Sequence, residues 1–188
     1  MAYLFKNFPT VEYDLKKNNK PIVLTNVMLR FKITEAIQRG AAIYYDYAVQ
    51  EGESASMIAH RLYGDATLDW LVYMINDVVD PLYDWPMAYD DFVNYVKSKY
   101  GSVSVALKTV HHYEKIINEG KIIDGDVAIP KRVVKVDQTT YNSLSPSERR
   151  EVDSYTYEDE ENEAKRQIIL LDPAFVTQIT NEVKNVLR

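Results

Sequence analysis

Three groups of side chains in this sequence could carry chemistry if their neighbours supported it. His111 and His112 stand together near Glu114, His60 lies in a helical stretch, and acidic side chains crowd residues 158–163. A zinc site needs three or four ligands at suitable spacing, and neighbouring residues on a strand point to opposite faces. We therefore expect surface histidines at positions 111 and 112, and no metal site.

The other two groups are no better as catalysts. A general base at His60 would need a nucleophile or a second titratable partner, and the sequence suggests neither. The acidic run lacks the spaced oxygens and central glycine of a calcium loop, so we interpret it as a solvated helix face. Lys165 and Arg166 follow it, as the helix dipole prefers. No catalytic residue and no cofactor is assigned, and the chain is not expected to be an enzyme.

Composition limits the kinds of partner. The chain of 188 residues has a formal charge of −6, which disfavours direct binding of nucleic acid. It contains no cysteine, so disulfides and thiolate sites are excluded. The N-terminal residues lack the pattern of a signal peptide, and no apolar run is long enough to span a bilayer. The 15 tyrosines suit either protein interfaces or a half-buried sheet.

The elements that would position these groups include a strand followed by two helices. Residues 43–50 alternate apolar and polar side chains, which predicts a half-buried strand. Ser54 is a candidate N-cap, and the apolar spacing of residues 55–62 predicts a short helix that Gly64 ends. The same spacing in residues 68–75 predicts a second helix that packs on the first as a hairpin.

The rest of the chain is predicted to add helices and a small sheet. Residues 90–100 predict a third helix, and the β-branched residues and turn signals of residues 103–136 predict a small antiparallel sheet. The capping-box form of residues 145–148 predicts a helix that begins there. Asp172 with Pro173 is expected to cap a final amphipathic helix. Its apolar face consists of Phe175, Val176, Ile179, Val183, Val186 and Leu187.

The fold class is therefore expected to be α+β, with three segments. Residues 1–42 form an N-terminal arm and connecting segment, with a polar loop at residues 16–21. After Thr25 the apolar spacing mixes helix and strand, so its type stays open. Residues 43–101 form the core module with the third helix. Residues 102–188 form the small sheet and the C-terminal helical extension.

The core module resembles the first half of a lysin motif, a small βααβ module that often binds N-acetylglucosamine polymers. The residues that carry this resemblance are Tyr47, Val49, Gly52, Glu53, Ile58, Ala59, Tyr63, Gly64, Leu68 and Asn76. A standard lysin motif closes soon after the asparagine with a strand of the form Gly-x-x-Leu-x-Ile-Pro, which residues 77–86 do not supply. Because a similar phrase occurs at residues 125–130, we expect an inserted helix to displace the closing strand to residues 127–129.

Longer stretches resemble the baseplate wedge protein 53 family of long contractile-tailed phages. They are residues 8–14, 63–71, 76–86 and 162–168, so the resemblance spans most of the chain. It implies a structural subunit that joins neighbouring wedges of the tail baseplate in the virion, assembled in the host cytoplasm. The implied partners are other wedge proteins, among them the helical subunits of the inner ring, and the sheath-initiating protein.

Two rival functions remain. A peptidoglycan-binding module is the first, but a lone lysin-type module is normally repeated or attached to a hydrolase, and this chain shows neither. An uncharacterised enzyme is the second, and it would need convergent titratable groups in a pocket. A scaffold that has lost glycan binding fits the sequence better than either.

An assembly role requires a rigid core with separate adhesive patches, which we assign to the arm, the aromatic loop near Pro81 and the C-terminal helix. Trp85 is an interface candidate because desolvated aromatic anchors dominate binding energy. Trp70 is expected to pack within the chain. The complete set of candidate interface residues is Phe5, Phe8, Tyr83, Trp85, Asn162, Arg166, Phe175 and Val183.

Overall fold

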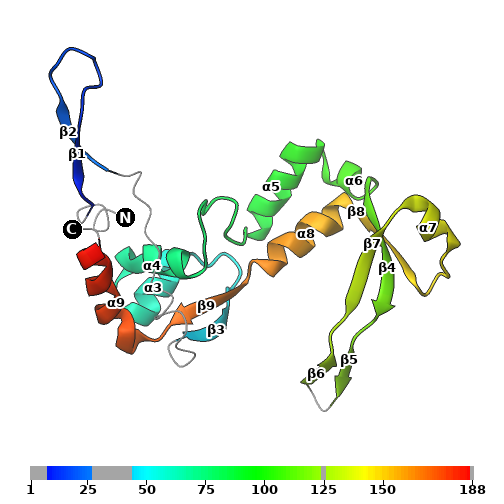
Figure 1. The fold of residues 1–188 in the computed structure, drawn as a ribbon. Helices are drawn as coiled ribbons and strands as arrows, with labels where there is room; N and C mark the ends of the chain where they lie inside the picture. Colours follow the sequence, from blue (N-terminus) through cyan, green and yellow to red (C-terminus); the bar gives the residue numbers. More distant parts are fainter. Residues whose placement is uncertain (1–7, 27–43, 124–125, 187–188) are drawn as a thin grey trace. The chain divides into compact units, whose positions relative to one another are not determined.

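The computed structural model describes residues 8–26, 44–123 and 126–186, and it confirms the α+β class (Figure 1). Two compact units divide the chain: residues 1–87 with 165–188, and residues 88–164. The second unit is thus inserted into the first. These boundaries differ from the three expected segments, because the third helix belongs to the second unit and the C-terminal residues return to the first. Within the described residues, no helix combines the length and apolar character needed to cross a membrane.

The first unit contains a two-stranded antiparallel sheet of β3 (Tyr44–Ala48) and β9 (Gln167–Leu171), which lie side by side in Figure 1. Tyr47 pairs with Ile168, and Asp46 pairs with Ile169. The prediction that residues 127–129 form the strand next to β3 is therefore wrong. Those residues lie in β6 (Asp126–Ile129), which pairs with β5 (Lys121–Ile123) in the second unit. The strand that pairs with β3 is β9, and the whole second unit separates these two strands along the chain.

Two helical segments follow β3 and confirm the predicted hairpin. They are α3 (Ala55–Tyr63) and α4 (Asp69–Ile75), joined through the short 3₁₀ helix η1 (Ala66–Leu68). The Ser54 hydroxyl accepts a hydrogen bond from the backbone N–H of Met57, so Ser54 is the predicted N-cap. Gly64 ends α3 with φ +74°, a left-handed conformation that glycine adopts without a side-chain clash.

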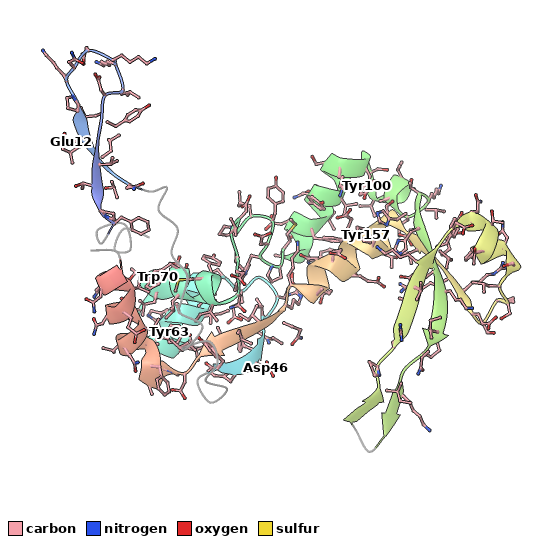
Figure 2. All side chains as sticks on the ribbon, in the orientation of Figure 1. Glu12, Asp46, Tyr63, Trp70, Tyr100 and Tyr157 are labelled. Atoms are coloured by element: carbon pink, nitrogen blue, oxygen red, sulfur yellow. The ribbon has the colours of Figure 1, made fainter. Side chains whose placement is uncertain are left out.

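An apolar interior holds this unit together. One cluster joins α3, α4 and β9 through Val49, Ala55, Ile58, Ala59, Val72, Trp85, Ile168 and Leu170. A second cluster adds α9 (Pro173–Val186) through Phe8, Leu71, Leu171, Ile179 and Val183. Figure 2 labels two aromatic residues of this unit, Tyr63 and Trp70. Trp70 packs against the second cluster, as predicted.

The C-terminal helix α9 begins where the sequence indicated. Asp172 Oδ1 accepts a hydrogen bond of 2.8 Å from the backbone N–H of Ala174. Phe175 and Val176 of the predicted apolar face pack partly buried against the second cluster, beside the buried Ile179 and Val183. The other two predicted positions, the Val186 side chain and Leu187, lie outside the described residues. The helix therefore docks on its own unit.

The N-terminal region contains a hairpin of β1 (Thr10–Tyr13) and β2 (Ile22–Thr25). The predicted polar loop connects these two strands. Phe5 and the segment 27–42, whose type the sequence left open, lie outside the described residues.

The second unit combines helices with a three-stranded sheet. It begins with α5 (Tyr89–Tyr100), which is the predicted third helix and ends at Gly101, and α6 (Val103–Ala106). The sheet order is β7-β4-β8, and its strands are β4 (Val110–Asn118), β7 (Arg132–Val136) and β8 (Arg149–Asp153). The β4–β7 pair and the separate β5–β6 pair confirm antiparallel strands in the predicted region, but residues 103–106 form α6 and the strand β8 was not predicted. The remaining helices are α7 (Gln138–Ser143) and α8 (Ser154–Ala164).

The prediction of a helix that begins at residues 145–148 is wrong. These residues form a turn in which the Ser145 hydroxyl donates to Glu148 Oε2 at 2.6 Å, and β8 follows. Val152 is buried in that strand. The helix α8 begins only after Asp153, whose Oδ1 accepts from the backbone N–H of Thr156 at 2.9 Å. A capping box is a local pattern, and here the strand pairing that follows prevails over it.

Candidate protein-interaction site

The loop between α4 and α5 carries the two most exposed large apolar side chains of the described residues, and an exposed tyrosine beside them. Val79 is 79% exposed, Leu82 is 76% exposed and Tyr83 is 58% exposed. We call residues 78–84 the apolar loop. Exposed apolar groups gathered in one short segment are typical of a contact surface for another protein.

Carboxylates inside the apolar loop fix its backbone. Asp84 Oδ2 accepts hydrogen bonds from the N–H groups of Val79 at 3.0 Å and Asp80 at 2.9 Å. Asp80 Oδ1 accepts from the N–H of Leu82 at 3.0 Å. The bonds from the Asp80 and Val79 N–H groups lower the pKa of Asp84, so this carboxylate is charged at neutral pH and the turn persists. The loop is therefore held in one shape.

Neighbouring residues anchor the loop to the first unit. Lys165 Nζ donates to the backbone oxygen of Tyr83 at 2.6 Å. Trp85 is only 8% exposed, and its Nε1 donates to the backbone oxygen of Glu53 at 2.9 Å. Its ring meets Tyr73 edge-on, with centroids 5.4 Å apart. Trp85 was expected at an interface, but it serves instead as the internal anchor beside the exposed Tyr83.

One of the residues that resemble a lysin motif, Glu53, is a buried carboxylate with several partners. Glu53 accepts from the Tyr47 hydroxyl at 2.7 Å and from the N–H of Gln50 at 3.1 Å, and Arg61 Nη1 lies 2.7 Å from its Oε1. Burial alone would raise the pKa of Glu53, but these hydrogen bonds and the Arg61 charge outweigh it and the pKa is lowered. Both carboxylate oxygens of Glu53 are engaged in holding the turn after β3.

The surface next to Glu53 is hollowed. An open hollow of about 430 Å³ is lined by Glu53, Ser56, Met57, His60, Arg61 and Ala66. His60 lies exposed on its rim. Among the described residues, no three or more His, Cys, Asp or Glu side chains are grouped so that they could hold a metal ion.

Two other residues of the resemblance, Asn76 and Tyr63, bind β9. The Asn76 side chain accepts from the N–H of Ile169 and donates to its backbone oxygen, both at 2.9 Å, as a neighbouring strand would. The Tyr63 hydroxyl donates to the backbone oxygen of Leu171 at 3.2 Å, and burial raises the pKa of Tyr63 to about 12. Asparagine and tyrosine at these positions therefore hold β9 in place.

Arg166 also has a structural role within the first unit. Its backbone oxygen accepts from the N–H of Val49 at 2.9 Å, which extends the β3–β9 ladder. Its Nη2 bonds Glu51 Oε2 at 2.5 Å. The pairing expected across an interface is thus made inside the chain.

The remaining interface candidates are mostly covered by the chain itself. Phe8, Asn162 and Val183 are each less than one tenth exposed. Phe175 is partly buried against the second apolar cluster. Of the candidates that the structure describes, Tyr83 is the one that belongs to an exposed patch. Val79 and Leu82 were missed, although the Asp-Pro pair between them marks a surface turn that could have indicated their exposure.

The acidic run of α8 does not form a fully solvated face. Glu158 is 8% exposed and accepts from Lys99 Nζ at 2.7 Å, the Tyr100 hydroxyl at 2.7 Å and the Tyr95 hydroxyl at 3.0 Å. Burial opposes ionisation, but these hydrogen bonds and the Lys99 charge lower the pKa of Glu158. The pairing also raises the pKa of Lys99. The expectation for residue 158 was wrong, because this carboxylate joins α8 to α5.

The adjacent histidines contact each other instead of pointing to opposite faces. The two Nδ1 atoms of His111 and His112 lie 2.8 Å apart, and β4 shifts its register with β8 between Val110 and His112. That irregularity breaks the alternation on which the prediction rested. The ring of His111 stacks on Tyr157 of α8, labelled in Figure 2, with centroids 3.8 Å apart. His111 is exposed, as expected, whereas the His112 side chain is only 14% exposed.

The first unit therefore presents an exposed apolar patch on a hydrogen-bonded scaffold. Comparison with known proteins adds that the model of the family described as "Base plate wedge protein 53" matches residues 3–185. The chain belongs to this family. It is similar to the baseplate wedge protein gp53 of Enterobacteria phage T4, with 24% identity over 189 residues that cover 98% of this chain and 95% of that protein. As a member of the wedge protein 53 family, it is a structural subunit of the tail baseplate in a phage virion.

Proposed function

We propose that this chain joins neighbouring wedges of the baseplate without any enzymatic activity, and that the apolar loop is one of the surfaces through which it does so. The proposed partners are the helical wedge subunits of the inner ring and the sheath-initiating protein. The observation that carries the proposal is the apolar loop itself, in which Val79 and Leu82 protrude from a backbone fixed by Asp84.

A fixed loop suits a joint for an energetic reason. Binding usually costs free energy because interface side chains and loops lose their freedom. The hydrogen bonds of Asp80, Asp84 and Lys165 have already ordered the backbone of this loop. More of the free energy from burying Val79 and Leu82 is then left to hold the wedges together.

The test is sedimentation velocity on the chain mixed with the matching wedge complex that lacks it. The unchanged chain is expected to incorporate and to promote closure of the wedges into a ring. The variant Val79→Thr/Leu82→Gln keeps the backbone N–H groups that bind the carboxylates but removes apolar contact area. It should bind at least about 10-fold more weakly.

The matched control is Met57→Gln, because Met57 is 59% exposed on α3, outside the apolar loop. This control should incorporate like the unchanged chain. A peptidoglycan pull-down runs beside both experiments. Retention of the unchanged chain on peptidoglycan, together with no association with the wedge complex, would contradict the joint and favour glycan binding.

A further inference from the structure

The N-terminal hairpin has one face made entirely of apolar side chains. Val11 stands opposite Leu24, and Tyr13 stands opposite Ile22. Because side chains alternate along a strand, these two pairs lie on the same face. All four are exposed, at 44% for Val11, 42% for Leu24, 55% for Tyr13 and 47% for Ile22. We call these four residues the hairpin face.

The other face of the hairpin differs in character. Thr10 opposite Thr25 and Glu12 opposite Val23 occupy it, so polar side chains predominate there (Glu12 is labelled in Figure 2). An isolated two-stranded hairpin is only marginally stable in water, because it has no second layer against which to bury a face. An amphipathic hairpin whose apolar side is exposed is therefore suited to bury that side against a partner.

The hairpin is nevertheless held in register at both ends. At the tip, the Asp14 carboxylate accepts from the N–H groups of Asn18 at 3.2 Å and Asn19 at 2.7 Å. At the base, the N–H of Asn26 donates to the backbone oxygen of Pro9 at 2.9 Å. The register that creates the apolar face is fixed by these contacts before any partner binds.

The tip has a charge opposite to that of the whole chain. Lys16, Lys17 and Lys20 are all exposed there, whereas the chain has a net charge of −6. The only acidic side chain in the turn is Asp14, and its oxygens bond the backbone. Three lysines beside an apolar face favour a partner surface with carboxylates next to an apolar strip.

We infer that the β1–β2 hairpin docks its apolar face, Val11, Tyr13, Ile22 and Leu24, onto another protein of the baseplate, whose carboxylates meet the lysine tip. The inference rests on the proposed function for the kind of partner, but it concerns a separate surface from the apolar loop. A lipid surface would also accept apolar side chains and lysines. The chain belongs to a family of baseplate wedge proteins, which are surrounded by other proteins of the tail, and this favours the protein partner.

The experiment measures binding of the full chain to the wedge complex that lacks it. Val11→Thr/Leu24→Thr keeps residues that favour strands while it makes the hairpin face polar. Its affinity should fall by at least about 10-fold. The control Val23→Thr changes a side chain that is 65% exposed on the opposite face, and its affinity should stay within about 2-fold of the unchanged chain.

A second variant, Lys16→Glu/Lys17→Glu, leaves the hairpin face and Asp14 in place. It should weaken binding at low salt, and the difference from the unchanged chain should shrink as salt screens the charges. Hydrogen exchange of the hairpin amides checks that both variants retain the strands.

Each outcome bears on a different proposal. If the unchanged chain joins the wedge complex and both hairpin variants join equally well, the hairpin inference is overturned while the proposed function stands. If the unchanged chain does not join at all, both fall. If the chain binds vesicles containing phosphatidylglycerol and the same variants lose that binding, the partner is a lipid surface and the protein assignment is wrong.

Discussion

The two compact units have interiors of different kinds. Both apolar clusters lie in the first unit, where residues such as Leu71 and Leu170 are fully buried. The first unit also buries the carboxylates Glu53 and Asp69, but next to these large clusters, whereas the second unit buries Glu114 and Glu158 alongside only a few apolar residues. Buried carboxylates contribute little net stability but penalise any arrangement that leaves them unpaired. The stability of the first unit should therefore fall mainly when a buried side chain loses volume, and the stability of the second unit when a buried side chain loses its charge.

The largest effect is expected from Leu170→Ala. This change leaves a cavity between β9 and the α3–α4 hairpin and should lower the free energy of unfolding of the first unit by about 2–5 kcal/mol. Urea unfolding followed by hydrogen exchange of individual peptides measures it. Amides of α5 and α8 should keep their protection. Equal loss of protection in both units would mean that they unfold together, and the contrast between their interiors would not matter.

A smaller effect is expected from Glu158→Gln in the second unit. The amide can still accept hydrogen bonds from Tyr95 and Tyr100, but it loses the charge that pairs with Lys99. The Lys99 side chain is 46% exposed, so water can solvate its ammonium group and partly replace the lost ion pair. We expect a loss of about 1–3 kcal/mol in the second unit. The exposed Glu161→Gln on the same helix is the control and should change stability by less than about 0.5 kcal/mol.

The smallest effect is expected from mild acid. Because the folded-state pKa of Glu158 lies below its ordinary value of 4.5, its contribution is complete above about pH 4.5 and is lost as the pH falls through the folded value. The pKa of Glu53 in the first unit is lowered as well, so acid should also weaken the first unit. The Glu158→Gln variant therefore serves as the comparison that isolates the contribution of Glu158. Between about pH 5 and pH 3 the second unit should lose more protection in the unchanged chain than in Glu158→Gln. If the unchanged chain and Glu158→Gln lost protection identically as the pH falls, ionisation of Glu158 would not contribute to the stability of the second unit.

The sequence predicted elements whose signals are local. Ser54, Gly64 and Asp172 mark helix ends through contacts within a few residues, and each was placed correctly. The strand β9 could not be paired with β3 in the same way, because the whole second unit separates them along the chain. A similar phrase at residues 125–130 was chosen instead, on the form of the residues alone.

Partners that are distant in sequence also explain the errors at the candidate sites. Glu158 belongs to an acidic run, and nothing within that run reveals the lysine and tyrosines of α5 that bury it. For Trp85, residue type suggested an adhesive side chain, but Glu53 and Tyr73 of its own unit already cover it. Exposure depends on the complete fold, so it could not be predicted from residue type.

The insertion of the second unit between α4 and β9 also sets an order of events during translation. Ribosomes add about 5–20 residues per second, so β3 waits on the order of 10 s for the strand that pairs with it. All of the second unit is synthesised during that interval. Its chain is complete before the first unit can close, and the nascent β3 edge is open to other strands until β9 emerges. The nascent β3 therefore lacks its partner strand throughout the synthesis of the second unit.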